Sequence, residues 1–388
     1  MKFAHWLRQE LTLAYCQART HKRWKANTIQ LSAQVEANLR QLCQDILQRR
    51  YVIRPSLCFV AEYPVKREIF AGDFRDRVVH HLVFNALAPL YERFFINDCY
   101  SCRKGFGTSY GVARMQKFLR QVTRNYSQPA YVLKLDISGY FMNIDRNILY
   151  RKNRTLVVHL FWDQPAKANL FLYLLRRIIF NDPTSDCRMR GSRIDWQDLP
   201  RNKSLFAASP GKGLPIGNLT SQLFGNLYLN DFDHFIKEKL KCCYYGRYVD
   251  DLVVMHRDKD FLKSIIPKID RYLRKNLGLC LHAKKIYLQD SCHGFSFLGT
   301  YIKPYRLYVG QRIKAGFYRH VRQAAKGEIA DPAFFNSYLG MMKHYNSYRL
   351  RQKIMTSPET QTALERLGLT VNLGFTKVIG KIGKIRLK

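Results

Sequence analysis

The stretch Tyr244–Met255, Tyr-Tyr-Gly-Arg-Tyr-Val-Asp-Asp-Leu-Val-Val-Met, places two adjacent acids between two short runs of β-branched and aromatic residues. This pattern predicts a β-hairpin with Asp250 and Asp251 at its turn. At a separation of about 4 Å and an effective dielectric constant near 20, two like charges repel by roughly 4 kcal/mol. A turn that gathers two carboxylates therefore needs a compensating interaction, and a divalent cation can supply it.

Magnesium fits such a pair, because Mg²⁺ is held by one or two carboxylates together with substrate phosphates. Two such ions can clamp both oxygens of a phosphoryl transfer. An Asp-Asp turn is also common in hairpins that bind nothing, so the pair alone leaves a purely structural turn open. A second apolar strand, residues 131–141, carries Asp136 near its end. Three carboxylates at one sheet edge favour a metal site.

Three segments, in this order, resemble motifs of reverse transcriptases. They are Leu-Asp-Ile-Ser-Gly-Tyr-Phe at 135–141, Gly-Leu-Pro-Ile-Gly-Asn-Leu-Thr-Ser-Gln at 213–222, and Tyr-Val-Asp-Asp at 248–251. Group II intron and retroviral enzymes usually carry Gln after Leu-Pro, whereas this chain has Ile216. That variant resembles the reverse transcriptases of diversity-generating retroelements, which occur in bacteria, phages and some archaea.

The resemblance, which runs from about residue 63 to residue 302, implies an α/β (α+β) fold. It is that of a right-hand polymerase with fingers, a palm in which an antiparallel sheet is backed by helices, and a helical thumb. The expected divisions are an N-terminal helical lead-in over 1–62, fingers over 63–130, a palm over 131–310 with an insertion at about 181–213, and a thumb with a basic tail over 311–388.

The resemblance also implies the activity and its metal ligands. An RNA-directed DNA polymerase copies a template RNA into cDNA from dNTPs, and in this group errors fall mainly opposite template adenines during mutagenic retrohoming. Asp136, Asp250 and Asp251 are the expected catalytic carboxylates. With the carbonyl of Ile137 they would hold two Mg²⁺ ions, for which Mn²⁺ can substitute.

Six residues are expected at the incoming nucleotide: Lys66, Arg67, Arg75, Phe141, Ile216 and Lys285. The basic side chains suit phosphate oxygens. Phe141 would close over the sugar and exclude a 2′-hydroxyl, although a core aromatic at a strand end is the other interpretation. Lys284 or Lys285 could act as a general acid on the departing pyrophosphate, and the sequence does not choose between them.

Three further residues are expected at nucleic acid. Arg103 and Lys104 lie in a glycine-rich basic loop, residues 97–111, which lacks the GxxxxGK[ST] pattern of a P-loop. Such side chains would contact phosphates, which position a nucleic acid without reading its sequence. Gly299 lies in a segment, residues 294–302, that resembles the primer-grip hairpin.

The charge supports a polyanionic partner. Among 388 residues, 65 Lys and Arg against 29 Asp and Glu give a formal net charge of +36, spread along the whole chain. The 24 Tyr and 24 Phe residues suit base stacking as well as core packing. A template RNA and an RNA/cDNA duplex are the expected partners. The alternative explanations of the charge are a solvated basic surface or binding to a membrane surface.

The remaining features predict a cytoplasmic protein, and the resemblance implies a bacterial or phage-infected cell. Ten scattered cysteines suit reduced thiols, and a zinc site is not expected because only Cys99 and Cys102 have CxxC spacing. Residues 1–10 contain His5, Arg8 and Glu10, unlike a secretory signal, and no run of 18 apolar residues is present. No membrane association is expected.

Members of this group work with a small, basic, oligomeric accessory protein, so the resemblance implies such a partner. A group II intron-type or retron reverse transcriptase is the alternative within enzymes. A catalytically silent RNA-binding protein with a polymerase-like fold is the alternative outside them. The sequence leaves open the template RNA, the priming mode, the target gene, the oligomeric state and the role of the insertion.

Overall fold

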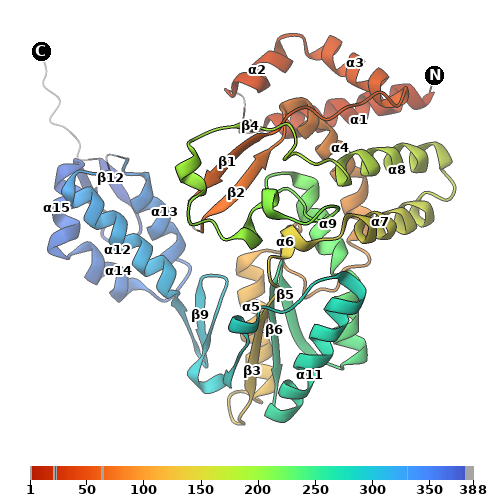
Figure 1. Ribbon diagram of the computed structural model, residues 1–388. Helices are drawn as coiled ribbons and strands as arrows, with labels where there is room; N and C mark the ends of the chain where they lie inside the picture. Colours follow the sequence, from red (N-terminus) through yellow and green to blue (C-terminus); the bar gives the residue numbers. More distant parts are fainter. Residues whose placement is uncertain (1, 21, 23, 63–64, 330, 381–388) are drawn as a thin grey trace, which may run out of the picture. The chain divides into compact units, whose positions relative to one another are not determined.

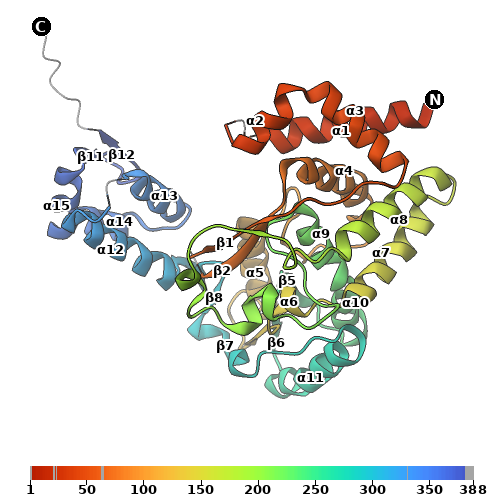
Figure 2. The same cartoon turned by 45° about the horizontal axis from the view of Figure 1, so that its top comes forward.

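A computed structural model describes residues 2–20, 22, 24–62, 65–329 and 331–380 (Figures 1 and 2). The expected first residue of the fingers, Tyr63, and the end of the basic tail, residues 381–388, lie outside the described residues. The chain forms two compact units. The first comprises Met1–Gly107, Lys134–Val254 and Asp260–Tyr287, and the second comprises Thr108–Leu133, Met255–Lys259 and Leu288–Lys388.

The first unit begins with three helices, as the apolar spacing predicts: α1 (Lys2–Arg19), α2 (Ala26–Ala33) and α3 (Val35–Leu47). Their apolar side chains recur every three or four residues, so each helix buries one face. Helix α1 packs against α3 and against α4 (Phe74–Tyr91). The N-cap of α4 is Asp73, whose side chain accepts a hydrogen bond from the backbone N–H of Arg75.

A small sheet follows, and the insertion supplies one of its strands. Strands β1 (Leu57–Ala61) and β2 (Arg67–Ala71) pair antiparallel. The two-residue strand β4 (Arg188–Met189), from the expected insertion, pairs parallel with the other edge of β1. Short 3₁₀ turns make up much of the remaining insertion.

Glu68 of β2 anchors the insertion. Its side chain is 1% exposed. One carboxylate oxygen accepts hydrogen bonds from Trp196 Nε1 and Ser204 Oγ, both at 2.9 Å, and the other accepts from the backbone N–H of Leu205 at 2.6 Å. Three donors of the insertion thus converge on a single buried carboxylate, which fixes this segment against β2.

Replacing Glu68 by Ala is expected to lower the free energy of unfolding by roughly 3 kcal/mol, because each buried donor left without an acceptor costs about 1–3 kcal/mol. Urea unfolding measures the loss, and faster trypsin cleavage at Arg201 and Lys203 would report the release of the insertion. The control is Ala at the exposed Glu62. An unchanged unfolding free energy in the Glu68 variant would contradict the anchoring role.

Helices α4, α7 (Arg146–Leu160), α8 (Pro165–Ile179) and α9 (Leu219–Tyr228) of the first unit pack on one another (Figure 1). Helix α9 contacts both α4 and α7, and α7 contacts α8. The apolar spacing predicts a helix after residue 222. The structure has α9, α10 (Asn230–His234) and a π-helical turn, Phe235–Lys239, in succession.

The expected hairpin is present in a four-stranded sheet. Strands β5 (Tyr244–Tyr248) and β6 (Asp251–His256) are neighbours in the order β5-β6-β3-β7, with β3 at Tyr131–Asp136 and β7 at Tyr287–Asp290. The interior of β6, from Leu252 to Met255, is almost fully buried. Helix α11 (Lys259–Tyr272) follows β6 in the chain.

The second unit contains helices and two small sheets. Helix α5 (Thr108–Val122) contacts β9 of the antiparallel sheet that β8 (Phe295–Phe297), β9 (Thr300–Lys303) and β10 (Arg306–Val309) form. The helices expected after residue 311 follow: α12 (Gln311–Lys326), α13 (Ala333–Met342), α14 (Tyr348–Met355) and α15 (Pro358–Arg366). They enclose a core that includes Phe317, Phe335 and Leu339. A hairpin of β11 (Leu369–Val371) and β12 (Val378–Gly380) comes last.

All ten cysteines are free in this structure. Among the residues that the structure describes, no helix combines the length and the apolarity needed to cross a bilayer.

Candidate active site

The three expected catalytic aspartates lie at the adjoining ends of two neighbouring strands, β3 and β6. Asp136 is the last residue of β3, Asp250 lies in the β5–β6 turn and Asp251 is the first residue of β6. The backbone N–H of Ile137 donates to the carbonyl of Asp250 at 3.2 Å, which ties the end of β3 to the turn. The backbone N–H of His282 donates to the carbonyl of Asp136 at 2.8 Å. Main-chain hydrogen bonds therefore bring the three residues to one end of the sheet, where β3 ends and β6 begins.

The carboxylates act on one another electrostatically. Burial raises the pKa of Asp250 to about 6, and the charges of Asp251 and Asp136 add to the shift, while Lys285 opposes it. Lys285 Nζ lies 2.9 Å from Asp136 Oδ2. Burial also lowers the pKa of Lys134, against the opposing effect of Asp251 and Asp136. The site concentrates negative charge, and Lys285 partly neutralises it.

This donor set fits magnesium, because it consists of carboxylate oxygens that repel one another until a cation joins them. Within the described ranges, no three His, Cys, Asp or Glu side chains are already grouped closely enough to hold a metal ion. One oxygen of Asp136 is engaged by Lys285. Lys285 would have to leave this oxygen before a metal ion could bind it. Of the two candidate lysines, Lys285 is the one with a direct contact to a catalytic aspartate.

The turn that carries the aspartate pair has unusual backbone geometry. Val249 has φ +56°, in the left-handed region that β-branched residues rarely adopt. Such a conformation costs about 1–3 kcal/mol and persists only where the surrounding structure enforces it. The strain lies directly before Asp250.

Two of the expected nucleotide-binding residues meet at one apolar cluster. Phe141 and Ile216 both pack against the buried side chains of Cys58, Phe70, Met142 and Leu205. The backbone also joins them to their neighbours. The Phe70 N–H donates to the carbonyl of Ile216, and the Leu214 N–H donates to the carbonyl of Phe141, both at 2.8 Å. Residues far apart in the sequence therefore form one surface beside β2.

Glycine is required at Gly217 for this approach. Its φ is +127°, and an added Cβ would lie 2.6 Å from the carbonyl oxygen of Phe70. No side chain fits there without moving β2 away from the Ile216 segment.

Gly225 of α9 also shapes the site, and sequence reasoning missed it. An added Cβ there would lie 3.3 Å from Cε1 of Phe141 and 3.5 Å from the ring of Tyr140. Phe141 therefore rests directly on the backbone of α9. A glycine inside a helical pattern was the available signal, but its partner is 84 residues away by number (225 − 141).

The three basic residues expected at the triphosphate have different surroundings. Arg67 is exposed at the start of β2. Lys66 Nζ donates to the carbonyl of Gln197 at 2.5 Å. Arg75 forms an ion pair with Asp45 at 2.5 Å, and its side chain is 13% exposed. In this structure Lys66 and Arg75 hold other parts of the protein, and their nucleotide contacts stay predictions.

The residues expected at nucleic acid differ in the same way. The side chain of Arg103 is 4% exposed and pairs with Glu92 at 2.8 Å. Its Nη1 donates to the carbonyls of Ile96 and Cys99, both at 2.7 Å, so it organises its own loop. Lys104 is exposed. Gly299, in the second unit, has φ +81° between β8 and β9, and its carbonyl accepts from the N–H of Gly310 at 2.8 Å.

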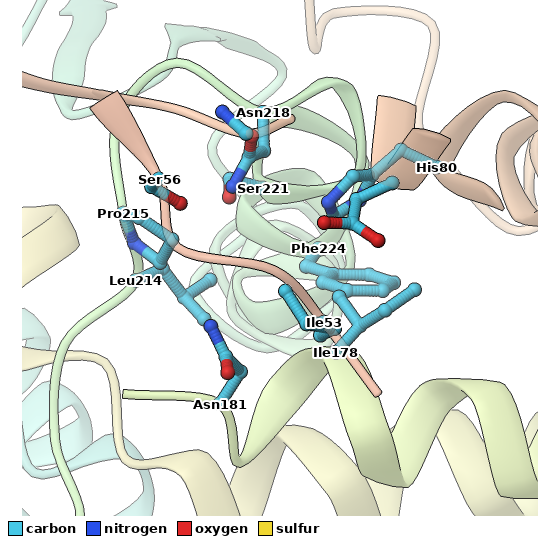
Figure 3. A pocket seen from close by; sticks show the side chains of 12 residues that line it. Ile53, Ser56, His80, Ile178, Asn181, Leu214, Pro215, Asn218, Ser221 and Phe224 are labelled. Carbon is cyan, nitrogen blue, oxygen red and sulfur yellow. The ribbon is translucent and has the colours of Figure 1, made fainter. Parts of the chain in front are cut away.

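Leu214, Pro215 and Asn218 line a small cavity of mixed polar and apolar character (Figure 3). Its volume of about 10 Å³ is that of about one water molecule. Asp76 and His80 line it. Burial raises the pKa of Asp76 to about 6 and lowers that of His80 to about 4. The cavity is too small for a nucleotide, so it belongs to the packing that holds the motif.

Comparisons with known proteins identify a matching family. The family described as reverse transcriptase (RNA-dependent DNA polymerase) matches residues 67–302. Protein YkfC of Escherichia coli is 22% identical over 307 residues, which cover 70% of this chain and 73% of that protein. A Saccharomyces cerevisiae protein named after intron 2 of COX1/OXI3 is 19% identical over 306 residues, which cover 62% of this chain but only 32% of the yeast protein.

Solved structures similar to this chain include telomerases. Apo telomerase from Candida tropicalis, truncated from its C-terminal domain, has 12% identity and a TM-score of 0.45, and the match covers 69% of this chain and 58% of the telomerase. Telomerase from Candida albicans, in complex with a fragment of telomeric RNA, has 10% identity and a TM-score of 0.45, with 82% and 56% covered.

The family match spans more than half of the chain, and the three aspartates lie within it. It confirms the predicted fold class, a mixed α/β right-hand polymerase, and the predicted enzyme class. Use of divalent metal ions and binding of template RNA are general properties of the family. The chain belongs to the reverse transcriptase (RNA-dependent DNA polymerase) family.

Proposed function

We propose that this chain copies a template RNA into cDNA by joining a primer 3′-hydroxyl to the α-phosphate of a dNTP. The observation that carries the proposal is the convergence of Asp136, Asp250 and Asp251 at one end of the sheet, beside Lys285. Extension of an annealed primer on RNA, with Mg²⁺ and dNTPs, tests it directly. A silent RNA-binding protein would bind the same duplex without extending it.

Each residue has a role in this reaction. Asp136, Asp250 and Asp251, with the carbonyl of Ile137, would hold two Mg²⁺ ions, whose charge would favour deprotonation of the 3′-hydroxyl and stabilise the leaving pyrophosphate. Lys285, once released from Asp136, can bring its ammonium to the pyrophosphate and donate a proton to it. Arg67, exposed at the start of β2, is available for the triphosphate.

We further propose that the enzyme is the mutagenic reverse transcriptase of a diversity-generating retroelement. Ile216 supports this, because an apolar side chain at that position supplies no hydrogen-bonding amide to a neighbouring base or nucleotide. Fewer polar contacts then penalise a misplaced base. Such an enzyme would act in the cytoplasm of a bacterial or phage-infected cell, together with a small, basic, oligomeric accessory protein.

Replacing Ile216 by Gln is expected to lower misincorporation opposite template adenines by about threefold to tenfold, the effect of about 1 kcal/mol of added discrimination. Sequencing of cDNA made on an RNA with all four bases measures the error at each template base. Ile216→Val keeps the apolar character and serves as the control. An unchanged error spectrum in the Gln variant would remove Ile216 from this role.

A group II intron-type reverse transcriptase is the second candidate, and the yeast relative named after an intron is the observation that favours it. The same sequencing separates the two. Errors gathered at adenines support the retroelement enzyme, whereas accurate cDNA supports the intron-type enzyme. If extension begins only after a native RNA and a small basic partner are added, the accessory protein is supported as well.

A further inference from the structure

The strained turn before the catalytic aspartates is held on both sides by side chains. Arg247 Nη1 donates to the carbonyl of Val249 at 3.0 Å. The backbone N–H of Val249 donates to Ser101 Oγ at 3.2 Å. Because the hydrogen-bonding groups of this one residue are occupied by a buried arginine and a buried serine, its left-handed conformation is fixed by the surrounding structure.

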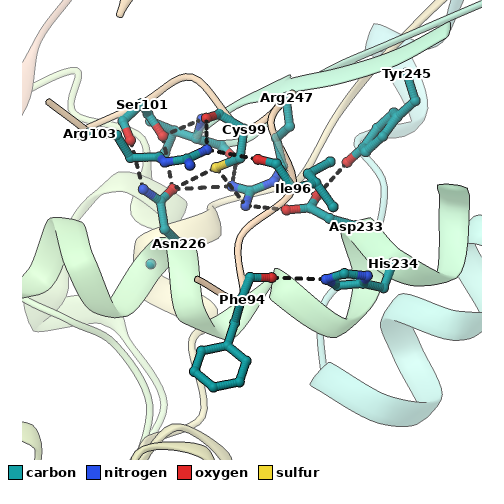
Figure 4. A network of polar contacts seen from close by, with 12 residues as sticks. Phe94, Ile96, Cys99, Ser101, Arg103, Asn226, Asp233, His234, Tyr245 and Arg247 are labelled. Carbon is teal, nitrogen blue, oxygen red and sulfur yellow. Dashed lines mark hydrogen bonds and ion pairs between the residues drawn. The ribbon is translucent and has the colours of Figure 1, made fainter. Parts of the chain in front are cut away.

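The side chain of Arg247 is itself held in one orientation by Asp233 (Figure 4). Its side chain is 0% exposed. Nε donates to Asp233 Oδ1 at 2.8 Å and Nη2 donates to Asp233 Oδ2 at 2.6 Å, a two-pronged pairing that orients the guanidinium plane. Tyr245 Oη donates to Asp233 Oδ1 at 2.6 Å and holds the acid from the other side.

The surrounding loop completes this support. Arg247 donates its backbone N–H to the carbonyl of Asp98 at 2.8 Å and accepts from the N–H of Tyr100 at 2.9 Å. Ser101, which follows in the same loop, donates to Asn226 Oδ1 at 2.9 Å. The residues that hold Val249 therefore come from three places in the first unit: strand β5, helices α9 and α10, and the loop before α5.

A buried ion pair is often no more stabilising than apolar side chains of similar size, so stability alone is a weak reason for this arrangement. What an apolar pair could not do is hold the Val249 carbonyl. In the Arg247 guanidinium, Nε and Nη2 bind Asp233, and Nη1 remains to donate to the carbonyl oxygen of Val249. A lysine has a single side-chain nitrogen and could not bind both groups in this geometry.

We propose that Arg247, oriented by Asp233 and assisted by Ser101, is a positioning residue that sets the Val249 backbone and thereby the placement of Asp250 and Asp251 for metal binding. This inference rests on the proposed function. Arg247 contacts neither substrate nor metal in this scheme, and it acts through the turn. Groups that orient metal ligands in this way typically contribute about 10-fold to 100-fold in metal affinity or activity.

The test measures the affinity of the full chain for Mn²⁺ in the absence of nucleotide. Electron paramagnetic resonance detects the Mn²⁺ that stays unbound. Arg247→Lys is expected to weaken Mn²⁺ binding by about 10-fold to 100-fold. In primer extension kcat should fall, while KM for dNTP changes little. Val249→Asn introduced into the Arg247→Lys chain should restore at least part of the lost affinity, because Asn adopts the left-handed region more readily than valine.

Arg351 of the second unit offers a matched control. It is also buried, and its Nη1 donates to the carbonyls of Gly374 and Phe375 at 3.2 and 3.1 Å. Phe375, like Val249, has a positive φ, of 51°. Arg351→Lys should lower the melting temperature yet leave the Mn²⁺ affinity within about twofold. The reason is that the carbonyls of Gly374 and Phe375 belong to a segment of the second unit that contains no expected metal ligand.

The outcomes are distinct. Wild-type Mn²⁺ affinity in Arg247→Lys, or no recovery with Val249→Asn, overturns the positioning role while the proposed function stands. A wild-type chain that neither binds Mn²⁺ nor extends a primer overturns both. If Arg247→Lys does not fold, Ser101→Ala decides. Weaker Mn²⁺ binding at an unchanged fold supports the proposal, and unaltered binding contradicts it.

Discussion

Replacing Asp250 by Asn is expected to reduce primer extension by at least about 1,000-fold, because a metal site supplies several kcal/mol of transition-state stabilisation and each 1.36 kcal/mol is a factor of ten. Asn keeps the shape of the side chain but loses the charge that binds the ion. Single-turnover extension on an annealed RNA template measures the loss. Asn at the exposed Asp163 is the control for the change in net charge.

The same substitution is expected to stabilise the metal-free protein. The pKa of Asp250 is raised from 3.8 to about 6 by burial and by its two acidic neighbours. A raised pKa means that the protonated form is favoured in the fold. The associated stability is fully present below about pH 4 and is lost as the pH rises through about 6. Asn resembles the protonated acid, so at pH 7.5 the variant should melt roughly 2–4 °C higher than the wild type.

Opposite signs for activity and stability identify Asp250 as a residue whose charge serves the metal. A variant that keeps extension within tenfold of the wild type would remove Asp250 from the ligand set. A variant that melts lower, with activity lost, would indicate that Asp250 supports the fold instead.

Replacing Phe141 by Ala is expected to reduce the preference for dNTPs over rNTPs by about 100-fold or more, since an exclusion worth about 2.7 kcal/mol is lost with the ring. Competition between the two nucleotides, expressed as a ratio of kcat/KM, measures the effect. Phe141→Tyr keeps the ring and should keep the preference. Continued exclusion of ribonucleotides by the Ala variant would assign Phe141 to the core.

Gly225→Ala tests the support beneath that ring. The added methyl would lie 3.3 Å from Cε1 of Phe141, so the ring must shift by a few tenths of an ångström. We expect KM for dNTPs to rise roughly threefold to tenfold, as for small misplacements of a positioning group, with the preference for deoxyribose retained. An unchanged KM would show that the ring tolerates the shift.

The placement of the aspartates could be predicted because each lies in a short motif with its own spacing. Strand periodicity puts Asp136 at the end of β3, and a two-residue turn leaves Asp250 next to Asp251. That β3 and β6 are neighbours does not follow from either motif, because the two strands are far apart in the sequence. Local patterns therefore predicted where each aspartate lies on its strand, and the family resemblance predicted that the strands meet.

The partners of the arginines could not be predicted, because a guanidinium binds carbonyls and carboxylates as readily as phosphates. Arg103 binds its own loop and Arg75 binds Asp45, while Arg247, within the quoted stretch, is wholly buried. Sequence composition favours solvent or nucleic acid for such residues. Asp45 and Asp233 lie 30 and 14 residues from their arginines, and the partners of Arg103 include two main-chain carbonyls, which no residue type marks.

The insertion has a consequence beyond its anchor on Glu68. Strand β4 covers the outer edge of β1, where the N–H groups of Arg188 and Arg190 donate to the carbonyls of Ser56 and Cys58, both at 2.8 Å. Without this strand, β1 would present unpaired backbone groups to any extended chain nearby. We therefore expect the short segment, which pairs with Leu57 and Cys58, to limit strand-to-strand aggregation most when bound RNA neutralises the net charge of +36 and lowers the repulsion between molecules.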